Sequence, residues 1–568
     1  MKKKWMFPDE KNMDGDILLR LLRSRGMEEE EVIADFLADR PKLTYDPFLL
    51  KDGEESARCI LEAVAAQKKI CIYGDYDADG ICSVTLMLEI LEKLGAKVSY
   101  YIPSRFEEGY GLNMEAIESI AGEGTGLIVT VDCGSVSAKE VEYAKDLGLT
   151  VIVTDHHKLN DDPARCLLVN PRQDSCSYPD KELCGCGVAF KLAQILSRLS
   201  GEYAGDMGKT LQKSDLSAVL DLVAIATVGD VVSLLGENRS LVKYGLKTIN
   251  SGKRKGLVEL IRRIELPEGE IRSEHLAYGI VPHLNAGGRI NTAKTGVTLL
   301  RGTEEGEIRE AAKILTENNR ERRKLQEEAF EEAARIVESR LEEEPVLVVD
   351  SPGTHEGIAG IVAGKIKEKY WKPTLLLTGA GDGHWKGTGR SIEGIDLYAM
   401  LSTGKDLFDK FGGHKGACGF LMKKENLSAL RDRLRDYAEG ILAEDPEAFL
   451  PRINIDQILS AEDLSLETVR RFAALEPFGQ NNPKPLFCLQ DLVPGNIGYM
   501  GDKGQHVRFT AGDLSCVLFG RAGEYGELLE GGEPLEFLGY AGINRWNGRE
   551  KIQFVVADMR CYNVENGR

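Results

Sequence analysis

The sequence predicts an α/β protein of several domains built around a parallel sheet. The chain has 568 residues, which is too many for one hydrophobic core and suggests about three or four domains. From residue 69, short apolar runs alternate with glycine-rich turns and helix-compatible stretches. This alternation is typical of βαβ units, in which helices connect parallel strands.

Composition and charge narrow the class of protein. Hydrophobic residues make up 42% of the chain and charged residues 29%, which is typical of a globular protein. No apolar run reaches the roughly 18 residues that span a bilayer. Lys2 to Lys4 resemble the start of a signal peptide, but Pro8 and the charged residues over 9–11 stand where its apolar stretch would be needed. We therefore expect a cytoplasmic chain without membrane association. The net charge of -19 argues mildly against nucleic acid, although a basic groove can lie on an acidic protein.

The first half of the chain carries the parallel-sheet pattern. Strands are expected over 69–73, 98–102, 126–131 and 149–154, with helices over 81–94 and 137–147. Residues 1–50 have a helical pattern and are expected to be peripheral, and residues 186–300 are expected to be mostly helical.

The second half predicts a long helix and two further folding units. Residues 303–343 carry apolar positions at helical spacing, with no glycine or proline after Gly306 until Pro345, which predicts a helix that connects two domains. A second α/β pattern follows over 345–440. Beyond residue 450, strands are expected over 506–510, 514–520, 535–540 and 551–557, with a hairpin signal at Asn547-Gly548. This last region predicts a small β-barrel or sandwich.

Acidic residues follow the predicted strands at their carboxyl ends. Asp75, Asp77 and Asp79 occupy alternate positions just after the first strand, while Asp132 and Asp155 follow the third and fourth. Because the carboxyl ends of parallel strands open onto one crevice, we expect these side chains to converge. Converging carboxylates repel one another unless cations neutralise them. The pattern therefore predicts a metal site.

Two histidines add a second kind of ligand. His156 and His157 follow Asp155 directly, and imidazole mixed with carboxylates suits Mn²⁺, with Mg²⁺ as the alternative. The shared acids favour a two-metal site, in which one ion makes hydroxide from water and both stabilise an in-line displacement at phosphorus. An EF-hand loop is excluded because the position of its bidentate acid holds Leu86. These residues predict a metal-dependent phosphoesterase.

Two features leave alternatives open. Asp221 and Asp230 stand at the ends of an apolar run over 222–228, and either could complete the metal site. Four of the twelve cysteines lie close in sequence but lack the paired C-x2-C spacing of zinc knuckles, which favours small buried side chains over a structural zinc. These four are Cys166, Cys176, Cys184 and Cys186.

The succession of motifs resembles a known family. The strings GDYDADG, VDCG, DHH and VGD, in this order, are similar to the motifs of the DHH phosphoesterase superfamily. Over roughly residues 15–560, the chain resembles the bacterial single-strand-specific exonucleases of that superfamily. Supporting motifs lie over 102–111, 282–291, 389–391, 412–414 and 477–483. Two departures are Thr388, where serine is expected, and Glu356, where proline is usual.

The resemblance implies an α/β multidomain fold. Its parts would be a parallel-sheet DHH catalytic domain, a long connecting helix, an α/β DHHA1 substrate-binding domain and a C-terminal OB-like β-barrel. The expected boundaries are 1–50 for an N-terminal helical segment, 51–300 for the catalytic domain, 301–344 for the helix, 345–445 for the DHHA1 domain and 446–568 for the OB-like domain.

The resemblance also implies an activity. We expect a 5′→3′ exonuclease that hydrolyses single-stranded DNA to 5′-mononucleotides in DNA repair and recombination, with two Mn²⁺ or Mg²⁺ ions as cofactors. Single-stranded DNA is the expected partner, and a single-strand-binding protein and a helicase are candidate protein partners.

Site residues follow from the same resemblance. His157 would face the scissile phosphate with Asp155 as its support, and these two are the expected catalytic residues. Asp230 is preferred to Asp221 because the family's fourth acid follows a small residue. The expected metal ligands are Asp75, Asp77, Asp79, Asp132, His156 and Asp230. The groups expected to hold phosphates are Arg105, Arg289, Thr388, Arg390, Ser391, Gly413 and His414, with Arg105, Thr388 and Arg390 nearest the 5′ end.

Two other functions compete with this interpretation. One is a phosphodiesterase or phosphatase of the same superfamily that acts on oligoribonucleotides, a cyclic dinucleotide or pyrophosphate; such relatives are generally shorter or lack the β domain expected over 450–560. The other is a non-catalytic DNA-binding relative that has lost its metals, and the intact set of acids argues against it.

Overall fold

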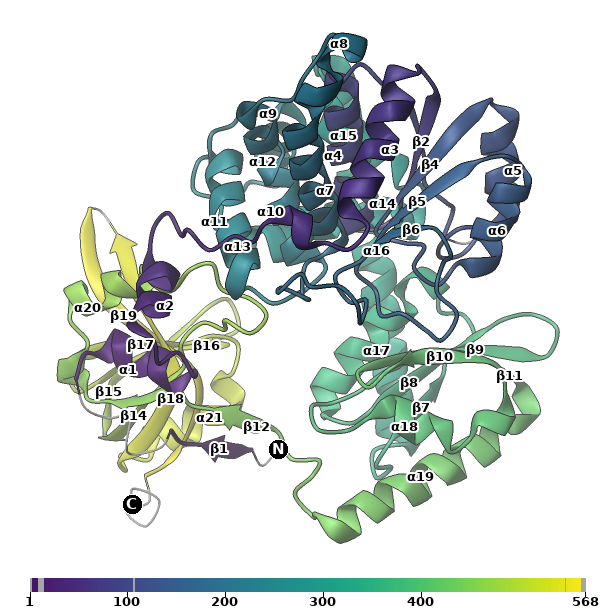
Figure 1. Cartoon of the computed structure of the whole chain (residues 1–568). Coiled ribbons are helices and arrows are strands. Elements are labelled where there is room, and N and C mark those ends of the chain that lie inside the picture. The colour runs from purple at the N-terminus through teal and green to yellow at the C-terminus, as the bar shows by residue number, and fades with distance from the viewer. Residues whose placement is uncertain (1–2, 9–14, 106–107, 547, 563–568) are drawn as a thin grey trace. The chain divides into compact units, whose positions relative to one another are not determined.

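The computed structural model describes residues 3–8, 15–105, 108–546 and 548–562. The chain forms two compact units, whose elements are labelled in Figure 1. The smaller unit comprises Met1–Lys4, Pro282–Gly296 and Arg309–Arg452, and the larger unit comprises Trp5–Val281, Val297–Ile308 and Ile453–Arg568.

The larger unit contains a five-stranded parallel sheet with the order β3-β2-β4-β5-β6. Its strands are β2 (Lys69–Tyr73), β3 (Lys97–Tyr101), β4 (Thr125–Val131), β5 (Thr150–Thr154) and β6 (Leu167–Val169). The four strands predicted from the sequence are confirmed to within one residue at each end. The fifth, β6, was not predicted, because three residues are too short for a periodic pattern.

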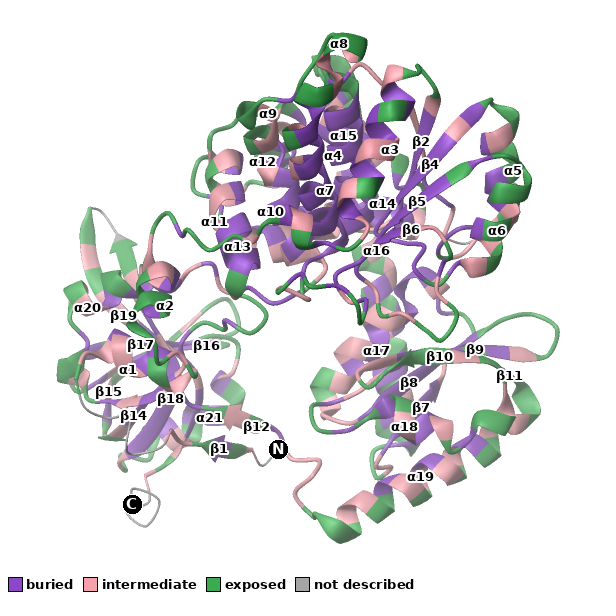
Figure 2. Cartoon of the chain, viewed as in Figure 1, coloured by how far each residue is buried: buried purple, intermediate pink, exposed green. Residues whose placement is uncertain are grey.

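Helices cover both faces of this sheet, as strands apolar on both sides require. The helices α5 (Met114–Gly122) and α6 (Ala138–Asp146) pack on one face, while α3 (Gly53–Ala65), α4 (Ala78–Lys93) and α7 (Gly185–Leu199) contact strands from the other. Figure 2 shows α4 and α7 as largely buried helices. The helices predicted over 81–94 and 137–147 are confirmed as α4 and α6.

The region 186–300 is mostly helical, as predicted. The helix α10 (Leu220–Gly229) packs against α4, α7 and α11 (Gly236–Asn250). The remaining helices here are η3 (Ser200–Tyr203), α8 (Ala204–Met207), α9 (Lys213–Ala218), α12 (Lys255–Arg263), α13 (Ser273–His275), η4 (Leu276–Ile280), α14 (Val281–Ile290) and α15 (Lys294–Arg301).

The C-terminal part of the larger unit is a seven-stranded mixed sheet with the order β13-β14-β18-β19-β17-β16-β15. Its strands are β13 (Gln457–Leu459), β14 (Phe487–Leu492), β15 (Pro494–Met500), β16 (His506–Ala511), β17 (Leu514–Leu518), β18 (Leu535–Trp546) and β19 (Arg549–Cys561). The end strands β13 and β15 do not pair in the described part of the chain, so the predicted barrel is not closed by hydrogen bonds there. Strands β18 and β19 extend beyond the predicted ranges and pair up to Trp546 and Arg549; the predicted turn residue Asn547 lies outside the described residues.

The N-terminal segment differs from the peripheral position that we expected. The helices α1 (Ile17–Ser24) and α2 (Glu30–Leu37) bury Leu18, Leu22 and Phe36 in the core of the C-terminal sheet. A short strand, β1 (Lys4–Met6), pairs with β12 (Arg452–Asn454). Helix α20 (Leu466–Arg471), turn η8 (Phe472–Leu475) and helix α21 (Ala522–Glu530) complete this core.

The smaller unit is an α/β layer structure. Its five-stranded sheet has the order β10-β11-β9-β8-β7 and is antiparallel except for the parallel pair β7 and β8. The strands are β7 (Leu347–Asp350), β8 (Thr374–Gly379), β9 (His384–Arg390), β10 (Phe408–His414) and β11 (Ala417–Lys423). One face packs against the long helix α16 (Glu305–Arg340) and α17 (Glu356–Tyr370), and the other against α18 (Leu397–Ser402) and α19 (Leu427–Glu444).

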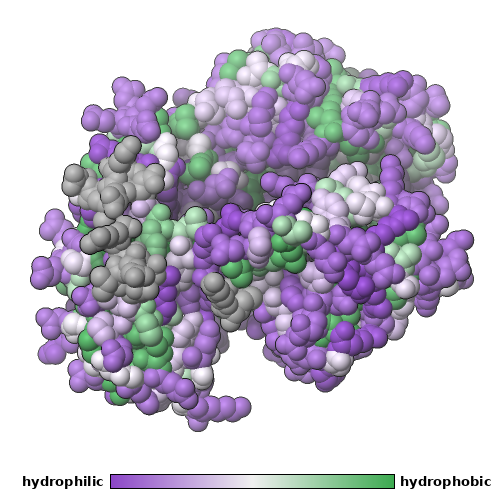
Figure 3. Space-filling model, turned by 90° about the horizontal axis from the view of Figure 1, so that it is seen from below, coloured by the Kyte–Doolittle hydropathy of each residue, from purple (hydrophilic) through white to green (hydrophobic). Residues whose placement is uncertain are grey.

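The face of the molecule drawn in Figure 3 is mostly polar, in keeping with the charged composition. Hydrophilic residues dominate the face seen in Figure 3, and hydrophobic ones occur there in small separate groups. No helix in the described ranges is both long and apolar enough to cross a membrane.

Candidate metal centre

Three adjacent parallel strands bring the predicted acids together. Asp132 and Asp155 directly follow β4 and β5, and Asp75 follows β2 after one glycine. Because these strands are neighbours in one parallel sheet, their carboxyl ends meet at one edge. The ligand atoms form three groups, each within 4.8 Å: Asp75, Asp77 and Asp132; Asp79, His156 and Asp230; and Asp132, Asp155, His156 and His157.

The loop after β2 determines the positions of Asp75, Asp77 and Asp79. Oδ1 of Asp77 accepts hydrogen bonds from the N–H groups of Asp79 (2.9 Å) and Gly80 (3.1 Å), so Asp77 caps α4. Asp79 lies in the first turn of that helix and is 1% exposed. A Cβ atom at Gly80 would stand 2.4 Å from the carbonyl oxygen of Asp75, so only glycine fits there. The loop therefore folds tightly enough to turn all three carboxylates to the strand end.

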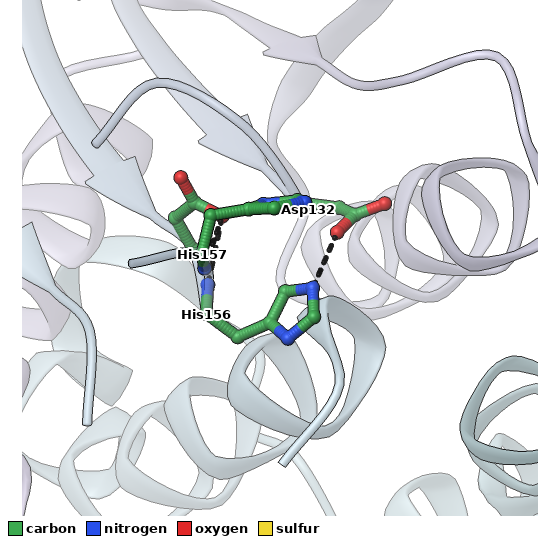
Figure 4. Close-up of side chains that lie close together, drawn as sticks. Asp132, His156 and His157 are labelled. Atoms are coloured by element: carbon green, nitrogen blue, oxygen red, sulfur yellow. Dashed lines mark hydrogen bonds and ion pairs between the residues drawn. The ribbon is translucent and has the colours of Figure 1, made fainter. Parts of the chain in front are cut away.

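His156 lies at the centre of the cluster. Its Nε2 atom is 3.2 Å from Oδ1 of Asp132, 3.5 Å from Oδ2 of Asp230 and 3.9 Å from Oδ2 of Asp79. Figure 4 shows its ring pointing to the Asp132 carboxylate. Burial, together with the charge of His157, lowers the pKa of His156 to about 3. The ring is therefore neutral, which is the form that binds metals.

His157 has a different partner and greater exposure. Its Nδ1 atom lies 2.7 Å from Oδ1 of Asp155, and 43% of its side chain is exposed. Burial works to lower the pKa of His157, but the hydrogen bond and charge of Asp155 outweigh it and raise the pKa to about 9. His157 is therefore a protonated side chain at the open side of the cluster.

Two residues near His157 were missed by the sequence analysis. The hydroxyl oxygen of Tyr110 lies 3.1 Å from Nδ1 of His157. Nδ2 of Asn170 donates to the carbonyl oxygen of His157 (2.9 Å) and to Oγ of Ser135 (2.9 Å). Asn170 directly follows β6, so a polar residue after a further short strand was the signal that could have found it.

The positions of Asp221 and Asp230 in the structure differ, although the sequence left both open as the acid that completes the metal site. Asp230 follows the end of α10 and belongs to the group of His156 and Asp79. Asp221 lies in the first turn of the same helix, where Nε of Arg254 (2.6 Å) and its Nη2 (3.1 Å) donate to its two oxygens. The structure therefore places Asp230 in the cluster and Asp221 in a buried ion pair.

Four carboxyl groups of the cluster have raised pKa values, because they are buried beside one another without enough positive charge to balance them. Burial, followed by the charge of Asp77, raises the pKa of Asp79 to about 7, and burial and the charge of Asp79 raise the pKa of Asp230 to about 8. The pKa values of Asp75 and Asp132 are also raised, mainly by burial. Oδ1 of Asp75 and Oδ1 of Asp132 are buried without a hydrogen bond among the described residues. Oxygen-rich ligands with one neutral imidazole fit a divalent ion such as Mn²⁺.

Arg105 is the one phosphate-binding candidate in the same unit as this cluster. Its guanidinium carbon lies 5.1 Å from the centroid of the Tyr76 ring, an arrangement in which cation and ring attract. Tyr76 stands between Asp75 and Asp77 in the loop. The contact therefore holds Arg105 beside the loop of acids.

The other phosphate-binding candidates lie in the smaller unit, at its sheet and around the start of α17. Nη1 of Arg289 donates to the carbonyl oxygen of Gly357 (2.9 Å). A Cβ atom at Gly360 would stand 2.7 Å from Nη2 of Arg390 and 3.4 Å from Cγ2 of Thr388. Arg289 thus lies against the first turn of α17, and Thr388 and Arg390 lie beside its second turn.

The end of the β10–β11 hairpin holds the remaining candidates. His414 pairs with Ala417, which pairs with Arg390. Gly413 has φ +145, and a Cβ there would stand 2.4 Å from the carbonyl oxygen of Ala417, so this bend needs glycine. Oγ of Ser391 donates to the carbonyl oxygen of Ile395 (2.7 Å). This hydrogen bond uses the proton of the Ser391 hydroxyl.

The cysteine cluster shows no arrangement for zinc. All described cysteines are free thiols, and Cys166, Cys176, Cys184 and Cys186 appear in none of the groups with metal-ligand geometry among the described residues. Cys184 and Cys186 are buried at the start of α7.

Three family models match the chain in the order that the fold displays. The DHH family, N-terminal domain, matches residues 69–227, the DHHA1 domain matches 343–440 and the RecJ OB domain matches 455–558. The fold and the cluster at the strand ends thus define a metal-binding phosphoesterase of the DHH type, and the predicted DHH, DHHA1 and OB-like parts are confirmed.

Comparison with whole proteins narrows the class. The chain is 38% identical over 551 residues to the single-stranded-DNA-specific exonuclease RecJ of Bacillus subtilis, covering 95% of this chain and 67% of that protein. It is 34% identical over 483 residues to the Escherichia coli protein of the same name, covering 83% of this chain and 82% of that one. The chain therefore belongs to the family of the RecJ exonucleases, which confirms the resemblance found in the sequence.

Solved structures agree with this assignment. The crystal structure of RecJ from Thermus thermophilus in complex with Mn²⁺ matches with a TM-score of 0.82 and 29% identity, over 99% of this chain and 80% of that one. A crystal structure of exonuclease RecJ bound to manganese matches with a TM-score of 0.59 and 33% identity, over 69% of this chain and 95% of that one. The Thermus protein was also solved in complex with Mg²⁺.

Proposed function

We propose that this chain is a 5′→3′ exonuclease specific for single-stranded DNA, which releases 5′-mononucleotides and acts in DNA repair and recombination. The observation that carries this proposal is the set of three overlapping ligand groups at the carboxyl edge of the parallel sheet, in a chain 38% identical to a single-stranded-DNA-specific exonuclease. The OB segment over 455–558 supports a polymeric substrate over a small phosphate ester.

The ligand groups support two ions, Mn²⁺ or Mg²⁺. Asp75, Asp77 and Asp132 would hold one, and Asp79, His156 and Asp230 the other. The ions would supply a hydroxide nucleophile and neutralise charge on the phosphate. Oδ1 of Asp132 is 3.2 Å from Nε2 of His156, so Asp132 lies where it can serve both groups.

The protein's own groups then orient the substrate. Nδ1 of His157 is engaged by Asp155. Its Nε2 lies 3.4 Å from the Tyr110 hydroxyl, and the Nε2–H group would donate to an oxygen of the scissile phosphate when substrate binds. Asp155 receives donors at both oxygens and acts through His157. These two residues are our candidates for catalysis.

The phosphate-binding groups hold the rest of the strand. We assign this role to Arg105, Arg289, Thr388, Arg390, Ser391, Gly413 and His414, with Arg105, Thr388 and Arg390 at the 5′ end. The contacts of Arg289, Thr388 and Arg390 around α17 support a shared phosphate site in the smaller unit. Arginine binds phosphate oxygens in pairs, and a bare glycine backbone allows close approach.

The remaining proposals concern the domain boundaries, the protein partners and the cellular compartment. We propose an N-terminal segment over 1–50, a catalytic domain over 51–300, a connecting helix over 301–344, a DHHA1 domain over 345–445 and an OB-like domain over 446–568. The family models match 69–227, 343–440 and 455–558, which overlap the second, fourth and fifth of these. The net charge of -19 supports delivery of DNA by a partner, such as a single-strand-binding protein or a helicase, in the cytoplasm.

A time course on end-labelled strands tests the function. With Mn²⁺, a 5′ label on single-stranded DNA is expected to appear at once as mononucleotide, while a 3′-labelled strand shortens gradually. Blunt duplex DNA and single-stranded RNA serve as controls and are expected to resist. Hydrolysis of dinucleotides or pyrophosphate alone would instead identify a small-substrate phosphatase of the same superfamily.

A further inference from the structure

The first turn of α7 contacts one of the candidate ligands through its backbone. The N–H of Gly185 donates to Oδ2 of Asp79 (2.7 Å), and the N–H of Cys186 donates to Oδ1 of the same carboxylate (2.7 Å). Both hydrogen bonds are buried, and more than a hundred residues of chain separate their partners. The carboxylate plane of Asp79 is therefore fixed by two donors from a distant segment.

These donors are available because a helix cannot use them itself. The first four N–H groups of an α-helix have no acceptor inside the helix. The N-cap residue Cys184 accepts from the N–H of Gly187 through its sulfur (3.3 Å), which leaves the N–H groups of Gly185 and Cys186 for Asp79. The positive end of the helix dipole also favours a carboxylate at this place.

The same turn lies against a second candidate ligand. A Cβ atom at Gly185 would stand 2.5 Å from Oδ1, 2.5 Å from Cβ and 2.7 Å from Cγ of Asp132, so a side chain at 185 would displace that carboxylate. Asp132 itself has φ 61, a left-handed conformation that leaves little freedom to yield. At Gly187, two residues further along, the nearest atom to an added Cβ is 3.4 Å away, an ordinary contact.

We propose that Gly185 and Cys186 are positioning residues of the metal centre. Their N–H groups orient Asp79, and the missing side chain of Gly185 lets Asp132 approach, so one helix turn sets the spacing between two ligands. The inference rests on the proposed function only in assigning metal binding to these acids. Partners of this kind typically change metal affinity about 10- to 100-fold when they are removed.

Two pairs of variants of the full chain test this role. Gly185→Ala adds the clashing methyl group, and Gly187→Ala adds the same group where there is space. Cys186→Pro removes one N–H donor, and Cys186→Ala is its conservative counterpart, which keeps the N–H. Proline is accepted in the first turn of a helix, and the residue before it here is glycine, which has no Cβ to clash.

The readout is the dissociation constant of Mn²⁺ in the absence of DNA, measured by electron paramagnetic resonance, with thermal denaturation as the check of folding. We expect about 10- to 100-fold weaker binding for Gly185→Ala and Cys186→Pro, and binding near that of the parent chain for the other two. Nuclease activity should return at high Mn²⁺ concentration. Unchanged Mn²⁺ binding by folded Gly185→Ala or Cys186→Pro would overturn the inference.

A measurement on the unaltered chain covers the case in which both variants unfold. Hydrogen exchange of the amides of Gly185 and Cys186 is expected to be slow, because both donate to a buried carboxylate. Fast exchange of both would overturn the inference. A chain that binds Mn²⁺ as described but does not degrade single-stranded DNA would refute the proposed function and leave the positioning role intact.

Discussion

Nδ1 of His157 lies 2.7 Å from Oδ1 of Asp155, although the neighbouring His156 points to Asp132. Asp155 also accepts the N–H groups of His156 (2.7 Å) and Ser135 (2.9 Å). Burial works to raise the pKa of Asp155, but the hydrogen bond and charge of His157 outweigh it, so the pKa lies below its ordinary value. Asp155 is thus an ionised partner of His157, in contrast to Asp75, Asp79, Asp132 and Asp230, whose pKa values are raised.

Asp77 is expected to be essential for activity, while its contribution to stability is that of a helix cap. Asp77→Asn should lose at least about a thousandfold in kcat, because a neutral amide cannot replace a metal-binding carboxylate. The melting temperature should stay close to the parent value, since asparagine also caps helices well. Asp77→Ala should lose the same activity and, in addition, about 1 kcal/mol of stability from the missing cap. Denaturant unfolding beside nuclease assays checks this, and substantial activity in Asp77→Asn would contradict it.

The acids at the two ends of α10 should give opposite phenotypes. Asp230→Asn removes a group 3.5 Å from Nε2 of His156 and is expected to weaken Mn²⁺ binding in a folded chain. Asp221→Asn breaks a buried ion pair with Arg254 and should cost about 3 kcal/mol of stability while Mn²⁺ binding persists. Calorimetric Mn²⁺ titration and urea unfolding of both variants separate the two roles. Equal loss of metal binding would show that the assignment is wrong.

Arg390 is expected to recognise the 5′ end of the strand. Arg390→Ala should reduce kcat/KM on 5′-phosphorylated DNA by about tenfold to a hundredfold, because a charge-assisted pair with phosphate is lost. The loss on 5′-hydroxyl DNA should be much smaller, and this substrate is the internal control. Steady-state assays on matched oligonucleotides give the ratio. An equal loss on both substrates would contradict a role at the 5′ phosphate.

Lys243 should make stability depend on pH in the alkaline range. Its Nζ atom donates to the carbonyl oxygen of Ala38 (2.7 Å), and burial, with the charge of Arg239, lowers its pKa from 10.5 to about 8. Between these values the unfolded chain binds more protons, so stability rises with pH across this window. Because the side chain is partly exposed, we expect a gain of about 1 kcal/mol between pH 7.5 and 9.5. Urea unfolding should show this gain reduced in Lys243→Met; identical pH profiles would refute it.

The parts of the site that follow local rules were visible in the sequence. Each strand of the catalytic sheet is an apolar run, and the acid after it needs only the geometry of parallel strands to reach the others. The positions of Asp75, Asp132 and Asp155 at one edge could therefore be predicted. Local rules left Asp221 and Asp230 open, because both flank the same apolar helix, and it was the family resemblance that favoured Asp230. In the structure, Asp230 belongs to a ligand group, while Asp221 pairs with Arg254.

Long-range contacts could not be predicted, because no local pattern encodes them. The apolar positions of α1 predict an amphipathic helix but not that Leu18 and Leu22 pack on the C-terminal sheet. The backbone donors of Gly185 and Cys186 were invisible for the same reason. The approach of Arg289 and Arg390 to the start of α17 likewise depends on the fold of the smaller unit.

The central claim is that the acid and histidine cluster hydrolyses single-stranded DNA from the 5′ end, and oxygen-18 labelling of the products tests it most directly. The parent chain, with Mn²⁺ and 5′-phosphorylated DNA in labelled water, should release only 5′-mononucleotides. Attack at phosphorus with departure of the 3′ oxygen leaves the new oxygen on the next nucleotide. The first nucleotide released, which comes from the 5′ end, should therefore be unlabelled, and each nucleotide released later should carry one labelled oxygen. Label in the nucleotides released first, or release of 3′-phosphates, would contradict the account.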